Sequence, residues 1–196
     1  DDTVIPLDLV RAAIDREVSL TANESIIWGL DVARFGGDNS ALCVRQGNTV
    51  LEIQSFASMD LMQLCGLIKN RYDDATVLER PQEILVDVIG IGAGVVDRLR
   101  EQNLPVRGVN VSESPSSKKN YLNLRAELWF AIKDWLAQRD CRLPNDDELV
   151  AELAAPLYKY TSTGKIKIES KDEMRKRGIK SPDKADALAL TMASSA

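Results

Sequence analysis

Three aspartates stand out in this sequence because each interrupts a run of apolar or small residues. Asp31 falls within an apolar stretch, Asp87 comes near the end of another, and Asp186 lies among alanines and leucines near the C-terminus. An ionised carboxylate without a partner is costly to bury, and a divalent cation would remove that cost. Mg²⁺ binds a few carboxylates and keeps its other positions for water and phosphate oxygens. Two such ions about 4 Å apart activate a water and stabilise the leaving oxygen of a phosphodiester, so the acids predict metal-assisted hydrolysis.

The rest of the composition excludes several kinds of catalytic and metal-binding site. The chain of 196 residues contains no histidine, which excludes Ser-His-Asp catalysis, Cys-His catalysis and histidine metal sites. Its three cysteines, Cys43, Cys65 and Cys141, are scattered along the chain. Neither a disulfide framework nor a thiolate zinc site is therefore expected, and a reducing, intracellular setting fits best. Acid–base or metal chemistry must fall to the carboxylates.

Each of the three acids also has a purely structural interpretation. Asp31 could cap the loop 33–39 that follows it. Asp87 could bond backbone amides in the glycine-rich segment 90–94. Asp186 could be a first-turn helix acid, which the helix dipole favours. The functional interpretation depends on the three occurring together.

A substrate with negative charge would need positive side chains. The formal net charge of -5 argues against a domain that holds nucleic acid by bulk positive charge. Positive charge is nevertheless concentrated in residues 165–184, where eight Lys and Arg stand against four Asp and Glu. A solvated helix face with internal ion pairs is the alternative, and nothing suggests readout of base sequence. The candidate phosphate contacts are Lys118, Lys119, Lys165, Lys167, Lys171, Arg175, Lys176, Arg177 and Lys180.

Buried strands must position the first two acids. Continuous apolar runs at 26–33 and 83–88 predict central strands that are buried on both faces. A turn at Gly47-Asn48 predicts a hairpin between strands over 40–45 and 49–56. The first three strands are therefore expected to form an antiparallel meander.

Helical periodicity and further apolar runs complete an α/β pattern. The final helix is expected to have Ser181 as its N-cap and Pro182 at its first position. The sequence thus predicts a mixed sheet with helices on both faces and an extra hairpin near the C-terminus. Residues 1–24 are expected to be a lead-in helix or linker and residues 25–196 the domain. The other expected elements are helices over 59–77, 92–102 and 121–138, a strand over 106–111, and hairpin strands over 157–160 and 166–169.

The helix predicted over 121–138 carries several large side chains. Its aromatic residues Trp129, Phe130 and Trp135 are expected to pack in the core rather than to stack on bases. Arg125 on the same helix is either a cation that supports the acids or a partner of Glu127 or another acid. This helix is therefore expected to be mainly a packing element.

Four segments together resemble the nuclease domain of the large terminase subunit of tailed bacteriophages, which has the RNase H-like fold. The resemblance covers nearly the whole chain from about residue 28, and the last segment combined with the first is its most specific part. The segments are GLDVA at 29–33 with the GDNS that follows, VD at 86–87 with the glycine-rich turn after it, NLRAELW at 123–129, and SPDKADAL at 181–188.

The resemblance implies a metal-dependent endonuclease that cuts concatemeric double-stranded DNA at the start and end of viral genome packaging. It implies that Asp31 bridges two ions, Mg²⁺ or Mn²⁺, while Asp87 binds one of them and Asp186 the other. Asp183, three residues before Asp186, stands where the family often has a polar residue, and is either an accessory ligand or a plain N-terminal acid.

The resemblance also implies partners. These are an upstream ATPase domain of the same polypeptide, the portal and the small terminase subunit, in the cytoplasm of an infected bacterium. The sequence has no GxxxxGK[ST] phosphate loop and no apolar run long enough to cross a bilayer. We therefore expect no membrane partner. The sequence begins with Asp1 rather than Met, which leads us to expect a C-terminal piece excised from a longer polypeptide.

Other interpretations use the same residues. The segment 89–94 could be a dinucleotide-binding turn, although three antiparallel strands precede it and Asp87 would face the pyrophosphate. Asp31 with Gly36-Gly37 could belong to an actin-like or sugar-kinase-type nucleotide-binding half, and a catalytically silent packaging scaffold is a further alternative. The nearest rivals are Holliday-junction resolvases and transposases of the same fold, which the domain upstream of this sequence would separate.

Overall fold

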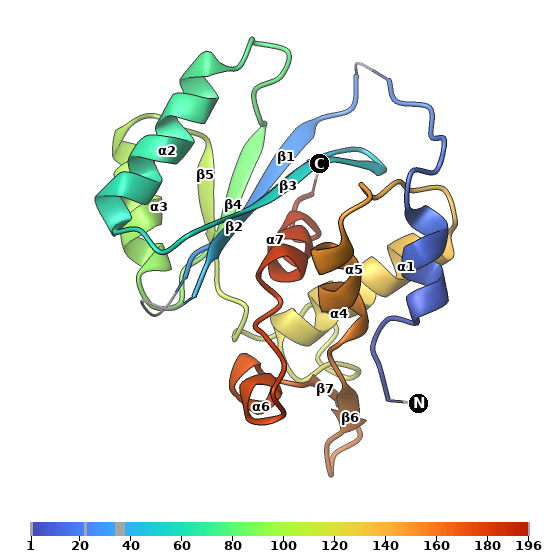
Figure 1. Cartoon of the computed structure of the whole chain (residues 1–196). Helices are drawn as coiled ribbons and strands as arrows, with labels where there is room; N and C mark the ends of the chain where they lie inside the picture. Colours follow the sequence, from blue (N-terminus) through green and yellow to red (C-terminus); the bar gives the residue numbers. More distant parts are fainter. Residues whose placement is uncertain (1, 22, 34–37, 196) are drawn as a thin grey trace.

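A five-stranded mixed sheet with strand order β3-β2-β1-β4-β5 forms the centre of the computed structural model (Figure 1). The structure describes all residues except 1, 22, 34–37 and 196. The three strands β1 to β3 are antiparallel neighbours, and β4 and β5 run parallel to β1, as the sequence predicts for the meander. The bounds are Ile26–Asp31 for β1, Ser40–Gln46 for β2, Thr49–Phe56 for β3, Glu83–Asp87 for β4 and Val106–Val109 for β5.

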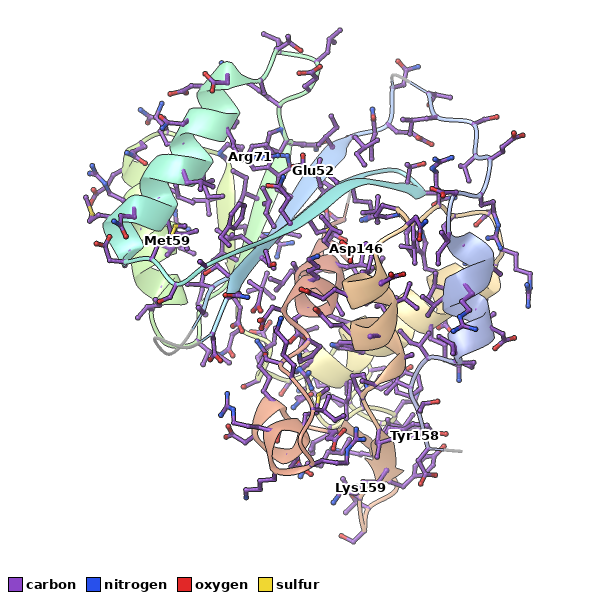
Figure 2. The ribbon with its side chains drawn as sticks, viewed as in Figure 1. Glu52, Met59, Arg71, Asp146, Tyr158 and Lys159 are labelled. Atoms are coloured by element: carbon purple, nitrogen blue, oxygen red, sulfur yellow. The ribbon has the colours of Figure 1, made fainter. Side chains whose placement is uncertain are left out.

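Helices cover both faces of this sheet (Figure 1). One face carries α2 (Leu61–Asp74) and α3 (Gly92–Glu101), and the Arg71–Glu52 ion pair ties α2 to β3 with a nitrogen–oxygen distance of 2.6 Å (Figure 2). The other face carries four helices, with α7 directly on β1 and β2. These are α1 (Leu7–Ala13), α4 (Leu124–Ala137), α5 (Asp147–Ala154) and α7 (Asp183–Thr191).

A small second sheet and a short helix extend beyond one end of the main sheet (Figure 1). Strands β6 (Tyr158–Tyr160) and β7 (Ile166–Ile168) pair as the predicted C-terminal hairpin, and α6 (Lys171–Lys176) follows it. The predicted mixed α/β fold with its extra hairpin is confirmed. Among the described residues, no helix combines the length and the apolar character that crossing a membrane requires.

Side-chain alternation along the strands decides which residues face α7, because successive residues in a strand point to opposite faces. Trp28 and Leu30 of β1 pack in the cluster under α2 and α3, so Ile27 and Asp31 face the opposite side. In β4 the same alternation places Leu85 and Asp87 on the α7 side. The two strand-end acids therefore share one face.

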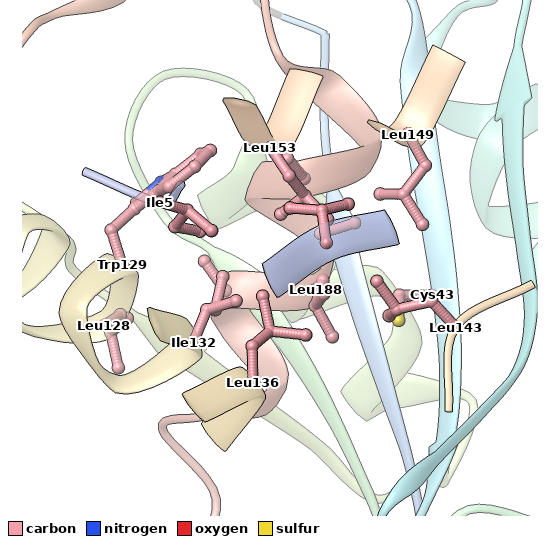
Figure 3. Packing of buried hydrophobic residues seen from close by; sticks show 14 of the residues in the cluster. Ile5, Cys43, Leu128, Trp129, Ile132, Leu136, Leu143, Leu149, Leu153 and Leu188 are labelled. Atoms are coloured by element: carbon pink, nitrogen blue, oxygen red, sulfur yellow. The ribbon is translucent and has the colours of Figure 1, made fainter. Parts of the chain in front are cut away.

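The largest buried cluster lies on the α7 side of the sheet, and residues of α4, α5 and α7 form much of it (Figure 3). Trp129 and Ile132 of α4 are fully buried there, beside Leu153 and Leu188. Val4, Ile5 and Val10 of the N-terminal segment belong to the same buried cluster. A division of the chain at residue 25 stays a prediction.

The structure corrects the start of the last helix. It begins at Asp183, with Pro182 at the N-cap position, rather than at Pro182 with a Ser181 cap. The Ser181 hydroxyl donates instead to the Asp183 carboxylate, at 2.6 Å. Proline has no side-chain oxygen, so the first-turn amides of α7 must find acceptors elsewhere. Helices α5 and α6 were not predicted, because α6 has only six residues and the spacing of Leu149 and Leu153 in α5 is a weak signal by itself.

Candidate active site

The three predicted acids line one cavity of about 200 Å³. Asp31 ends β1, Asp87 ends β4, and Asp186 lies in the first turn of α7. All three are buried, with at most 8% of each residue exposed. Lys171, Arg125 and Lys167 line the same cavity and supply positive charge to it. The three acids, each more than fifty positions from the next in the sequence, are thus brought together at one edge of the sheet.

The ammonium group of Lys171 lies between the carboxylates. Its Nζ is 3.1 Å from Asp31 Oδ2, 3.3 Å from Asp186 Oδ2 and 3.9 Å from Asp183 Oδ1. Burial alone would lower the pKa of Lys171, but the surrounding carboxylates raise it above its ordinary value. Lys171 is therefore a permanent cation at the position where the acids converge, rather than a residue on the open surface.

The pKa values of the two carboxylates nearest to Lys171 shift in opposite directions, although burial by itself would raise both. It raises the pKa of Asp31 to about 7, and the neighbouring Asp186 and Asp183 add to this while Lys171 opposes it. Burial would also raise the pKa of Asp186, but Arg125, Lys171 and a hydrogen bond from Trp129 hold it below its usual value. Asp186 is therefore the more firmly ionised member of the pair.

Helix α4 holds Asp186 in place. Trp129 Nε1 donates to Asp186 Oδ1 at 2.9 Å, and Arg125 Nη2 lies 3.4 Å from the same oxygen. The other arm of Arg125 donates to the carbonyl of Glu169 at 2.7 Å. The expected packing of Trp129 is confirmed, and of the alternatives for Arg125 the structure shows contact with Asp186 rather than with Glu127. The sequence did not show that the indole also orients an acid, because nothing in the α4 pattern names its partner on α7.

The other two acids have local contacts as well. Asp87 Oδ1 accepts from the backbone amide of Ile89 at 3.1 Å, just before the glycine-rich segment 90–94. Asp183 accepts from Ser181 and lines a smaller cavity that also contains Asp38 and Lys171. Burial raises the pKa of Asp183. The alternatives that invoke the loop 33–39 or Gly36-Gly37 involve residues 34–37, which lie outside the described residues.

A further buried acid, Glu152 of α5, was not predicted. Only 6% of this residue is exposed, and burial raises the pKa of its carboxyl to about 8. Its Oε1 accepts from the amides of Lys184 and Ala185, at 2.7 and 3.2 Å. In the sequence, its only signal is an acid between two leucines, at 149 and 153, that are spaced like core residues.

The nine candidate phosphate contacts divide into two groups. Lys167, Lys171, Arg175, Arg177 and Lys180 form ion pairs with acids of this chain. Among the described residues, Lys118, Lys119, Lys165 and Lys176 have no such partner within 4.0 Å. The second group is therefore the freer to contact an external anion.

Three of these unpaired lysines belong to segments that lie side by side. The loop before α4 joins β7 through two backbone hydrogen bonds, from Ile166 to Asn120 at 2.8 Å and from Leu122 to Ile166 at 2.9 Å. Lys118 and Lys119 belong to that loop, and Lys165 immediately precedes β7. Glu127 of α4 anchors the loop by accepting from the amides of Ser116 and Ser117. These contacts hold the loop and β7 together beside the cavity.

The donor set suits a hard divalent cation, which prefers carboxylate oxygens. Asp186 Oδ2 supports this fit, because it is buried and, apart from the Lys171 ammonium 3.3 Å away, has no hydrogen-bond partner among the described residues. In the present arrangement, however, no three acid or thiol side chains of the described part of the chain lie close enough to hold one ion. Lys171 Nζ contacts the oxygens that would do so. An ammonium and a divalent ion on the same oxygens repel each other strongly, so a metal requires Lys171 to withdraw.

Comparison with known proteins identifies the fold. No family model and no curated protein sequence matches the chain. The solved nuclease domain of the large terminase subunit gp2 of bacterial virus Sf6 matches with a TM-score of 0.78 and 22% identity, over 98% of this chain and 99% of that one. The large terminase nuclease of thermophilic phage G20c matches with a TM-score of 0.73 and 14% identity, over 99% of both chains. The chain therefore has the fold of large terminase nuclease domains, as the resemblance predicts.

Proposed function

We propose that this chain is the nuclease domain of a phage large terminase subunit and hydrolyses phosphodiesters of concatemeric double-stranded DNA with the help of divalent metal ions. The observation that carries the proposal is the convergence of Asp31, Asp87 and Asp186 in one cavity of a chain with this fold. Solved structures of this fold are described with manganese for the Sf6 domain and with magnesium for the G20c domain. That this chain also uses such metals is part of the proposal.

The proposal assigns the metal ligands to the three strand-end and helix-start acids. Asp31 would bridge two ions of Mg²⁺ or Mn²⁺, Asp87 and Asp186 would each hold one, and Asp183 would be an accessory ligand. When bound, the metals would supply the Lewis acidity that activates a water and stabilises the leaving oxygen.

Residues of the chain itself perform the other tasks. Trp129 and Arg125 hold one oxygen of Asp186, and its second oxygen lies 3.3 Å from the Lys171 ammonium. Lys171 offsets the negative charge of the cluster until a metal takes over that role. Lys118, Lys119 and Lys165 contact DNA phosphates beside the cavity. Contacts of this kind carry no sequence information, which agrees with cutting that has little sequence preference.

The biological setting belongs to the same proposal. A terminase nuclease acts with an ATPase domain of its own polypeptide, the portal and the small terminase subunit, in the cytoplasm of the infected bacterium. A resolvase or transposase of the same fold would use similar acids on a different DNA substrate. A branched DNA junction offered beside linear duplex therefore separates these possibilities.

Cleavage of supercoiled plasmid with Mg²⁺, Mn²⁺ or EDTA tests the proposal. The parent chain is expected to nick and linearise DNA with either metal and to be inactive in EDTA, while Asp186→Asn is inactive throughout. Asp73→Asn is the matched control, because Asp73 lies on α2, on the other face of the sheet, and is half exposed. A folded parent chain that cleaves nothing, or an Asp186→Asn variant that cleaves as fast as the parent, would overturn the metal-nuclease assignment.

A further inference from the structure

The first turn of α7 is capped by a side chain from another helix. The first four amides of a helix have no acceptor within it and need one elsewhere. In α7 the Asp183 amide donates to the Ser181 carbonyl at 2.9 Å. The next two amides, of Lys184 and Ala185, donate to Glu152 Oε1 of α5 at 2.7 and 3.2 Å. These are the second and third helical positions, which an N-cap side chain normally satisfies.

A second contact joins the same two helices. Lys184 Nζ lies 2.8 Å from Asp146 Oδ2. Asp146, which is labelled in Figure 2, is itself the N-cap of α5, because its side chain accepts a hydrogen bond from the Leu149 amide. The start of α7 is thus fastened to α5 by its backbone and by the Lys184 side chain. Glu152 is the buried member of this pair of contacts, since Asp146 is more open to solvent.

Two site acids depend on that first turn. Asp183 is the first residue of α7, and Asp186 completes its first turn. Trp129 and Arg125 hold Asp186 independently of Glu152. Within the described part of the chain, the Asp183 carboxylate contacts the Ser181 hydroxyl and, at 3.9 Å, the Lys171 ammonium. Fraying of the turn would therefore move Asp183 first and would loosen Asp186 next.

Burying the carboxyl group of Glu152 costs free energy that an apolar side chain at position 152 would not cost. Glu152 lies between Leu149 and Leu153, which are fully buried. An apolar side chain of similar size would avoid the cost of burying a polar group. The capping contact with α7 gives a reason for an oxygen acceptor at this position.

We propose that Glu152 is a positioning residue for the carboxylates of α7: it caps the first turn of that helix and thereby sets Asp183 and Asp186 against Asp31. Glu152 lies outside the cavity that the three acids line, so it acts through the backbone of α7. The proposal rests on the metal-nuclease function above, and extends it to a residue on a fourth element.

Three variants of the full chain test this role. Glu152→Gln keeps an oxygen acceptor of the same reach, whereas Glu152→Leu keeps the volume and removes the acceptor. Glu148→Leu makes the same change on the same helix, at a side chain that is 42% exposed and lies 3.7 Å from the Lys184 ammonium, so it controls for the loss of a side-chain contact with α7 that leaves the backbone cap in place. The amide exchange rates of Lys184 and Ala185, the affinity for Mn²⁺ without DNA, and kcat and KM for plasmid cleavage are measured for each.

The expected pattern separates positioning from simple loss of stability. Glu152→Leu raises the exchange rates of the two amides about tenfold or more, weakens Mn²⁺ binding about tenfold and lowers kcat with little change in KM. Glu152→Gln and Glu148→Leu stay within about twofold of the parent. A folded Glu152→Leu variant with parental amide protection and Mn²⁺ affinity would overturn the proposal.

The unaltered chain provides a test that no folding defect can obscure. If Glu152 caps α7, the Lys184 and Ala185 amides exchange about as slowly as the Leu188 amide in the middle of the helix. Rapid exchange of the two amides in the parent would refute the cap. A parent chain that protects both amides but binds no Mn²⁺ would instead refute the metal-nuclease function and, with it, the positioning role, while leaving the cap itself intact.

Discussion

Gly29 of β1 lies directly beneath the carbonyl of Ala187 in α7, so closely that a Cβ at position 29 would stand 2.0 Å from that oxygen. The contact lies two residues before Asp31 on the strand and one residue after Asp186 on the helix. Because Gly29 and Asp31 share one face of β1, the same approach that needs a glycine brings the two carboxylates to the two sides of Lys171. The close packing of α7 on β1 is therefore a condition for the site.

Gly29→Ala should push α7 away from the sheet. Overpacking a tight contact of this kind costs about 1–3 kcal/mol of the free energy of unfolding, and the displaced helix should also weaken Mn²⁺ binding. Gly66→Ala is the control, because a Cβ at that position in α2 meets no atom within 4 Å. That change should stabilise the chain by about 0.5–1 kcal/mol. Urea unfolding and Mn²⁺ titration check both variants, and a Gly29→Ala chain as stable as the parent would contradict the argument.

Lys171→Met should destabilise the metal-free chain and make it more responsive to metal. The change leaves Asp31 and Asp186 buried without their common cation, and breaking a buried ion pair from one side costs about 3–5 kcal/mol. Mg²⁺ or Mn²⁺ should restore part of this loss, so that the metal-induced rise in Tm exceeds that of the parent.

Lys180→Met is the control for that experiment. Lys180 is 60% exposed and pairs with Glu148 at 3.8 Å, and surface pairs contribute about 1 kcal/mol or less. Thermal melting with metal and with EDTA distinguishes the two lysines. An equal metal response in Lys171→Met and in the parent would mean that Lys171 does not compete for the carboxylates.

Trp129→Phe should remove the indole donor to Asp186 while keeping most of the buried ring. A hydrogen bond to a charged group contributes about 1.5–3 kcal/mol, so stability should fall by that order and Mn²⁺ affinity should fall with it. Trp135→Phe is the matched control, because Trp135 Nε1 donates to the neutral Asn48 side chain at 3.2 Å. The control should lose about 1 kcal/mol and bind Mn²⁺ like the parent. Equal Mn²⁺ affinity in both variants would show that the indole does not orient Asp186.

Replacing Lys118, Lys119 and Lys165 with alanine should weaken DNA binding and make the remaining binding less dependent on salt concentration. Each phosphate contact that is lost should reduce the slope of log K against log salt concentration by about 0.9. Replacing Arg177 or Lys180 with alanine should change the slope less, because Glu169 and Glu148 already neutralise these two side chains. Anisotropy titrations of a labelled duplex between about 50 and 200 mM salt measure the slopes. An unchanged slope in the triple variant would move the DNA-binding surface elsewhere.

The buried thiols should be unreactive until the chain unfolds. Burial raises the pKa of Cys43 to about 12, with Arg45 opposing it, and raises that of Cys141 to about 11. Since the thiolate is the reactive form, a disulfide reagent near pH 8 should label the denatured chain far faster than the native one. The folded pKa values lie above the ordinary value of 9.0, so the stability that these thiols contribute is complete below about pH 9 and falls as the pH rises beyond it. Rapid labelling of the native chain would contradict this.

Local pattern in the sequence was enough for most of the framework. The apolar runs around Asp31 and Asp87 predict two central strands, and the turn at Gly47-Asn48 predicts the antiparallel hairpin of β2 and β3. The structure confirms the two strands and the hairpin. These features are local, because a strand's alternation, a helix period and a turn each depend on a few adjacent residues. The three acids could be named for the same reason, since each disturbs the apolar pattern around it. Their shared function stays a proposal.

Only the tertiary structure decided how those acids are held. Lys171 contacts Asp31 across 140 positions, and Glu152 caps α7 across 32. Neither partner is marked in the sequence: Lys171 is one of eight basic residues in its segment, and Glu152 is one acid in a short helix. Contacts of this kind depend on the angle and separation at which packed elements meet, here on the close approach of α7 to Gly29. A pattern of adjacent residues carries no information about that distance, so the three acids could be named from the sequence and the contacts that hold them could not.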